Sequence, residues 1–209
     1  MMTEKIEDPA ADIAWMRRVA EEGRQGPMQG ASILFAAGLL YGGASLGHWA
    51  VASGVAGFDM EAVNYIWIGA TVVFFAVLVL AIRAIKRVGG VETSANRASG
   101  TAWASVGWGI FALSLSMAAL VWRLGEDSAL VAFALMPSMI MVFYGCGWAV
   151  TAAMMRSKPL WGLAIASFAA APLIAALTGS ADQYLAYAAA LFLLMALPGF
   201  LLMRAAKQA

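Results

Sequence analysis

The side chains best able to bind a metal or to move a proton are few in this chain, and they lie in two apolar stretches. His48, the only histidine, stands in YGGASLGHWA, and Met136, Met139 and Met141 stand together in MPSMIM. Histidine and methionine are both ligands of haem iron and of copper. The chain has no second histidine to complete a strong site. We therefore predict no cofactor and no metal, unless a second chain supplies the missing ligand at His48.

Several patterns that carry catalysis are absent from the sequence. The long apolar runs have no Asp, Glu, Lys or Arg in their middle, although proton-coupled transporters usually need such a group as a relay. A catalytic serine needs a base beside it, and the zinc-protease motif H-E-x-x-H needs two histidines. These absences predict that the protein is not an enzyme. The net charge of +1 leaves no basic field for nucleic acid.

The elements that hold these residues are long apolar segments. The composition, 63% hydrophobic and 12% charged, is typical of membrane proteins. A helix needs about 20 apolar residues to cross a bilayer, and six segments qualify: 29–52, 62–84, 100–122, 129–155, 160–178 and 183–204. We predict an all-α integral membrane protein in which residues 28–209 form a six-helix transmembrane bundle, built as three helical hairpins.

The basic residues indicate the orientation of this bundle. Of the 13 Lys and Arg residues, all but Arg123 fall on one side of the predicted spans. The positive-inside rule then places both termini on the cytoplasmic side of the membrane. We expect this membrane to be a bacterial inner membrane. Arg123 would lie on the outer rim, where it pairs with the nearby Glu126 and Asp127 or contacts a lipid phosphate or a partner carboxylate.

Residues 1–27 are expected to form a separate cytoplasmic element. Asp8 and Pro9 can begin a helix over residues 8–25, in which apolar side chains such as Trp15 gather on one face and charged ones on the other. An amphipathic helix of this kind lies on the membrane surface or docks on a partner protein.

The first predicted span is built for close packing. Two small-xxx-small pairs, Gly38 with Gly42 and Gly43 with Gly47, lie on opposite faces of the helix. Small residues let helix backbones approach closely in lipid. We predict that this helix is sandwiched, either between neighbours in the bundle or between the bundle and a second chain.

His48 falls between those two faces, near the end of the same span. It lies about 25 Å of helical rise after Ala31, which is the depth of the outer interface. Beside Trp49 it fits a polar rim residue that reaches water. We expect His48→Gln to leave stability nearly unchanged, the alternative being a ligand completed by another subunit.

Prolines interrupt three predicted helices in the second half of the chain: Pro137, Pro172 and Pro198. Each removes a backbone hydrogen bond and frees the carbonyl four residues earlier, so these helices can kink. If the kinks converge, Ser138, Tyr144 and Cys146 would line a cavity for a small apolar or amphipathic ligand. The alternative is that the prolines only shape helix packing.

Two functional hypotheses follow from these patterns. The first is a non-catalytic accessory or scaffolding subunit of a membrane complex, which contacts membrane lipids and a protein partner as a homo- or hetero-oligomer. The second is a small uniporter or lipid-handling protein that uses the cavity between the last three helices.

Overall fold

The computed structural model describes residues 13–15, 30–88, 93–125 and 132–208, with Lys86 and Val88 described in backbone only. These residues form helices and no strand. Six helices are long and apolar enough to span a membrane, in the six places that the sequence predicts. Their bounds are α2 (Ala31–Ala52), α3 (Glu61–Val88), α4 (Ser94–Leu124), α6 (Met136–Met155), α7 (Lys158–Ala175), and a last span made of α8 (Asp182–Leu191), the π-helical η1 (Phe192–Ala196) and α9 (Leu197–Ala206).

Local chemistry sets several of the helix ends. Thr93 is extended, and its side chain accepts a hydrogen bond from the Asn96 backbone N–H, which caps the start of α4. Arg156 takes a left-handed conformation at the end of α6, with φ 50°. Pro159 then lies in the first turn of α7, where its missing N–H costs nothing. This short connection makes α6 and α7 an antiparallel pair.

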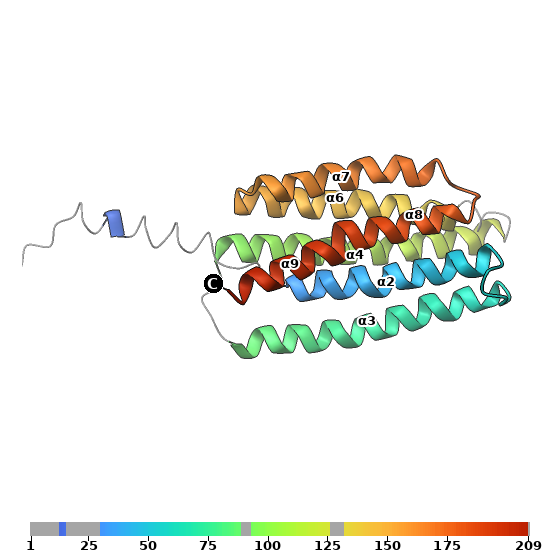
Figure 1. Ribbon diagram of the computed structural model, residues 1–209, viewed down its shortest axis with the longest axis horizontal. Coiled ribbons are helices and arrows are strands. Elements are labelled where there is room, and N and C mark those ends of the chain that lie inside the picture. The colour runs from blue at the N-terminus through green and yellow to red at the C-terminus, as the bar shows by residue number, and fades with distance from the viewer. Residues whose placement is uncertain (1–12, 16–29, 89–92, 126–131, 209) are drawn as a thin grey trace, which may run out of the picture.

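The helices lie side by side, as Figure 1 shows, with α3 at one edge and α7 at the other. α2 packs against α3 on one side and against α8, η1 and α9 on the other, while α6 packs against α4 and α7. The first two predicted hairpins are therefore neighbouring pairs. The third is not a close pair, because α7 packs mainly on α6 and the last span mainly on α2.

A hydrophobic core fills the middle of the bundle. Its largest fully buried apolar side chains are Met141, Trp148, Leu191 and Met195. Thr151 and Ser45 are buried among them, and both donate hydrogen bonds to backbone carbonyls, Thr151 to Gly147 and Ser45 to Tyr184. Buried hydroxyls need such partners because no water reaches them. α3 and α4 contribute little to this core.

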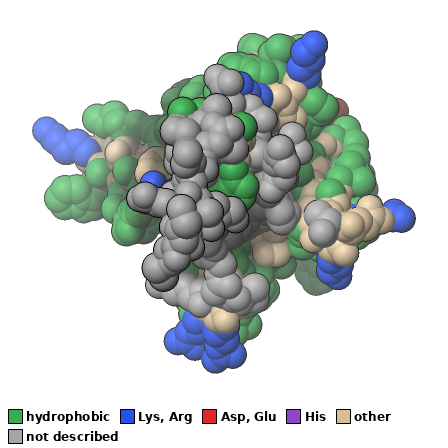
Figure 2. Space-filling model, turned by 90° about the vertical axis from the view of Figure 1, so that its left-hand side faces the viewer, with side chains coloured by type: hydrophobic (Ala, Val, Ile, Leu, Met, Phe, Trp, Pro, Cys, Tyr) green, Lys and Arg blue, Asp and Glu red, His purple; other side chains and the backbone are tan. Residues whose placement is uncertain are grey.

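Charged residues gather at the two ends of the bundle. The described basic residues at one end are Arg83, Arg87, Arg97, Arg156, Lys158, Arg204 and Lys207. Figure 2 looks onto this end and shows Lys and Arg side chains projecting around its rim. The described acidic residues, Asp59, Glu61 and Asp182, precede or begin helices at the other end, where α4 finishes with Arg123. This is the charge distribution that the sequence predicts.

Most of the predicted N-terminal element lies outside the described residues. Within it the structure describes residues 13–15, which are helical, and both Ile13 and Trp15 are exposed there. The amphipathic helix over 8–25 therefore stays a prediction.

Candidate functional site

His48 lies in an aromatic cluster that joins three helices. The indole Nε1–H of Trp67, from α3, donates a hydrogen bond to His48 Nδ1 at 3.1 Å. The imidazole also stacks on Tyr184 of α8, with ring centroids 3.4 Å apart and planes inclined by 26°. Because Nδ1 accepts this bond, the neutral ring carries its proton on Nε2. His48 therefore connects α2 to both of its neighbours.

His48 lies near the end of its helix, as the sequence predicts, but it is less exposed than predicted. It lies one turn before the end of α2, yet only 9% of its surface is exposed. An open polar rim residue would show a much larger exposed fraction. The reason is that Tyr184 covers one face of the ring, while Trp67 meets the ring at its Nδ1 edge. Met141, one of the methionines considered as a ligand, is fully buried in the hydrophobic core.

Three tyrosines form a second group nearer the centre of the bundle. The ring of Tyr41 in α2 lies against Trp67 and Phe74 of α3, with ring centroids 6.3 and 5.3 Å away. It also packs against the hydrophobic core that contains Tyr144 of α6 and Tyr187 of α8, both of which are buried. Neutral phenols in an apolar interior supply hydrogen bonds and ring packing. This group can align four helices, but it offers no paired base for a nucleophile.

Near Pro137 and Pro198, backbone carbonyls accept hydrogen bonds from side chains of neighbouring helices. Pro198 lies in the first turn of α9, directly after the π-helical segment η1. The carbonyl of Leu194, four residues before it, accepts a hydrogen bond from the Trp148 indole at 3.0 Å. The chain also turns at Leu135, before Pro137, where Gln183 of α8 donates to the Ala134 carbonyl.

The residues predicted to line a cavity do not converge. Cys146 and Pro172 are exposed, whereas Pro137, Pro198 and Tyr144 are buried by packing. Ser138 donates its hydroxyl to the Ala171 carbonyl of α7 at 2.9 Å. The observed bonds therefore favour the alternative in which the prolines shape helix packing.

The glycines of α2 divide into three kinds of position. A Cβ atom on Gly38 would lie 2.7 Å from the Cα of Ala196, and one on Gly42 would lie 2.7 Å from the Phe192 ring. Gly47 faces α3, since a Cβ there would come within 3.2 Å of Ile66. These contacts match the predicted sandwich, in its form between neighbours within the bundle.

Gly43 differs from the other three glycines. A Cβ atom added to it would meet no atom within 4 Å in the described part of the protein, and the residue is exposed. Gly43 therefore has no packing partner in the described part of the bundle, although Gly47 of the same predicted pair contacts α3. The cause is geometric, because the two neighbours of α2 leave a third side of the helix uncovered.

The exposed faces of α3 and α4 have different compositions. On α3 the exposed side chains include the aliphatic Val72, Val79 and Leu80, together with aromatic Tyr65 and Phe75 and the small Gly69 and Ala76. On α4 one stripe carries small and hydroxyl residues around the bulky Trp108 and Leu115: Thr101, Ser105, Ala112, Ser116 and Ala119, all of them exposed. The three hydroxyls of this α4 stripe donate back to carbonyls of their own helix at 2.9 Å.

Arg123 is exposed in the last turn of α4, next to Trp122. A cation is favourable at this helix end because the C-terminal carbonyls carry partial negative charge. Its predicted partners Glu126 and Asp127 lie outside the described residues. No protein-family model, no curated protein and no solved structure matches this chain.

Sequence reasoning missed the residues that join the helices to one another. Trp67 donates a hydrogen bond to His48, and Tyr184 stacks on it. Trp148 donates to the carbonyl of Leu194, and Gly199 allows α9 to pack closely on α2. The sequence contained one indication of the Trp148 contact, because Pro198 leaves the Leu194 carbonyl without its helical partner, and the Trp148 indole donates to this carbonyl. The other partners depend on which helices meet, and that information is not local.

Proposed function

We propose that this protein is a non-catalytic integral membrane protein that acts by association, as an accessory or scaffolding subunit of a membrane complex in the bacterial inner membrane. Both termini and the basic end of the bundle face the cytoplasm in this proposal. The observation that carries it is the exposed α4 stripe, residues 101–119, which has the composition of a helix–helix interface and no neighbour in the described chain on that side.

The chemistry of the α4 stripe favours protein rather than lipid as its partner. Lipid tails are as apolar as leucine, so helices associate in a bilayer through close van der Waals packing and hydrogen bonds rather than through hydrophobic burial. Small residues such as Ala112 and Ala119 allow that close approach, and Trp108, 72% exposed, supplies a large ring to bury. Hydroxyls already bonded to their own helix can enter such an interface without leaving a donor unsatisfied.

The exposed face of α3 serves as an internal comparison. Val72, Val79 and Leu80 are bulky aliphatic side chains that suit contact with acyl chains. Both helices lie at the periphery of the same bundle, and of the two only α4 presents exposed serine and threonine side chains. The open side of α2 at Gly43 offers a second small surface for the same kind of partner.

Site-specific photo-crosslinking in native membranes tests this proposal. A benzoylphenylalanine residue at Ala112 should give one discrete protein adduct of higher mass, because that position lies in the middle of the α4 stripe. The same residue at Val72, on the aliphatic face of α3, should give no discrete protein adduct. Mass spectrometry of the Ala112 adduct identifies the partner, and a second copy of this chain would indicate a homo-oligomer.

Two outcomes would contradict the proposal. If neither position gives a protein adduct, the α4 stripe faces lipid and association loses its support. If Val72 gives the same adduct as Ala112, the crosslinks report crowding and not a specific surface.

A further inference from the structure

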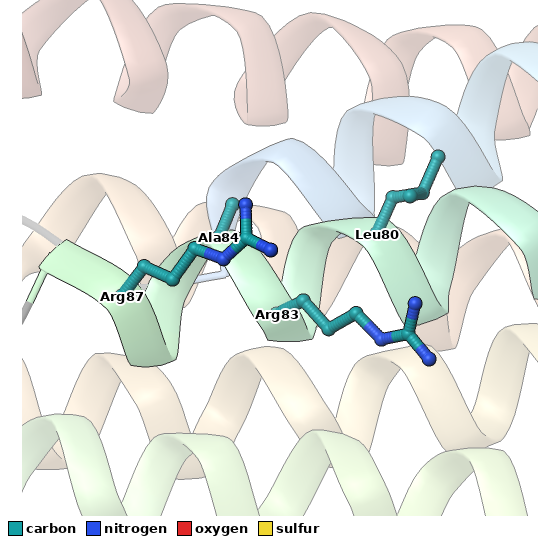
Figure 3. A pocket seen from close by; sticks show the side chains of 4 residues that line it. All are labelled: Leu80, Arg83, Ala84 and Arg87. Atoms are coloured by element: carbon teal, nitrogen blue, oxygen red, sulfur yellow. The ribbon is translucent and has the colours of Figure 1, made fainter.

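A hollow of about 350 Å³ lies on the outward side of α3, near the basic end of the bundle. Its lining comes from Leu80, Arg83, Ala84 and Arg87, which belong to successive turns of that one helix. Figure 3 shows both arginine side chains lying along α3 and reaching back toward the middle of the helix. The hollow thus combines two cations with an apolar floor.

Arg83 and Arg87 lie one helical turn apart on the outward side of α3. Residues four apart on a helix have Cβ atoms about 5–6 Å apart, so the guanidinium groups of Arg83 and Arg87 can reach a single phosphate. Guanidinium presents a planar fork of donors that matches phosphate oxygens. The described acidic residues, Asp59, Glu61 and Asp182, lie at the opposite end of the bundle. Within the described chain, none of them is near enough to neutralise this pair.

An apolar track continues from the arginines along the same face of α3. At 100° per residue, Val72, Ala76 and Val79 fall within about 40° of the direction of Arg83. All three are exposed, as is Leu80. A ligand with an anionic head and an aliphatic tail can therefore contact the cations and the track at once, whereas a free anion uses only the cations.

We propose that this hollow binds an acidic phospholipid, with its phosphate between Arg83 and Arg87 and one acyl chain along Val72, Ala76 and Val79. The proposal rests on the membrane insertion assumed in the proposed function. In that orientation the hollow lies at the cytoplasmic leaflet, where basic pockets on membrane proteins bind acidic head groups. It gives α3 a lipid partner and leaves α4 for the protein partner.

Native mass spectrometry measures this binding. The protein is released into mild detergent that contains equal amounts of phosphatidylglycerol and phosphatidylcholine with the same acyl chains. The wild-type chain should retain one phosphatidylglycerol molecule with a preference of about 30-fold over phosphatidylcholine, from two cations at a membrane surface. R83Q/R87Q should lose the preference. Both arginines are exposed, so the variant should keep the wild-type elution volume in size exclusion.

R156Q/K158Q is the matched control, because it removes the same charge from the same end of the bundle. It should keep the bound phosphatidylglycerol. Equal loss in both variants would overturn the proposal in favour of diffuse surface charge, and an unchanged preference in R83Q/R87Q would overturn it outright. Inorganic phosphate should not raise the melting temperature of the wild type. If it does so as strongly as phosphatidylglycerol, the hollow binds a soluble anion and the proposal is wrong.

Fractionation separates this proposal from the one on which it rests. A chain that is absent from the membrane fraction contradicts the proposed function. A chain that is present there but shows no preference for phosphatidylglycerol contradicts only the phospholipid site.

Discussion

The sharpest consequence of the packing is a difference between two glycines on the same helix. At Gly38 an added methyl group would lie 2.7 Å from the Cα of Ala196, a backbone atom that cannot rotate away. Overpacking of this kind costs about 1–3 kcal/mol. At Gly43 an added methyl group meets open space. Replacing glycine by alanine inside a helix also contributes about 1 kcal/mol of stabilisation, equally at both sites.

The propensity gain cancels in the difference between Gly38→Ala and Gly43→Ala, so the difference isolates the clash. We expect Gly43→Ala to equal or exceed the wild type in stability, and Gly38→Ala to lie about 2 kcal/mol below Gly43→Ala. For a chain of this size, that is a gap of about 4–8 °C in melting temperature. Thermal unfolding in detergent, followed by size exclusion, measures it. Equal melting temperatures for the two variants would refute the close contact between α2 and η1.

Three further predictions concern the hydrogen bonds and the topology. His48→Ala should destabilise the protein by about 1–3 kcal/mol, measured by thermal unfolding, because the acceptor of an indole N–H and a stacked ring are both lost; an unchanged melting temperature would restore the open-rim interpretation. Trp148→Phe keeps a ring in the core but leaves the Leu194 carbonyl without its donor, and it should lower the stability by about 1–3 kcal/mol in the same assay; no loss would mean that another group bonds this carbonyl. Once Cys146 is replaced, a cysteine at Gly57 should react with an impermeant reagent added outside and one at Ser94 should not; the reverse pattern would invert the proposed topology.

The six helices could be predicted from the sequence because their signal is local. Length and apolar composition define each segment, and the structure has helices in all six places. The charge separation between the two ends was equally visible, since positive-inside counting needs only the order of segments and loops.

The pairing of the helices and the surroundings of His48 could not be predicted in the same way. Which helices meet depends on how glycines fit against residues far from them in the sequence, such as Gly38 against Ala196 and Gly145 against Phe168. The place of His48 near the end of its helix followed from counting residues, but its burial depends on Tyr184, which is 136 residues away. Gly43 shows the same limit, because a small residue permits close approach without specifying that a neighbour is there.

The central claim is that this protein works by association, and the mass of the particle tests that claim most directly. Native mass spectrometry of the chain, extracted from its own membranes in mild detergent, should show a complex that contains at least one more protein chain beside the 21.9 kDa subunit. A112L/S116L should release the subunit as a folded single chain, because leucine fills the small face of α4. A wild-type particle of one 21.9 kDa chain with lipid alone would contradict the account.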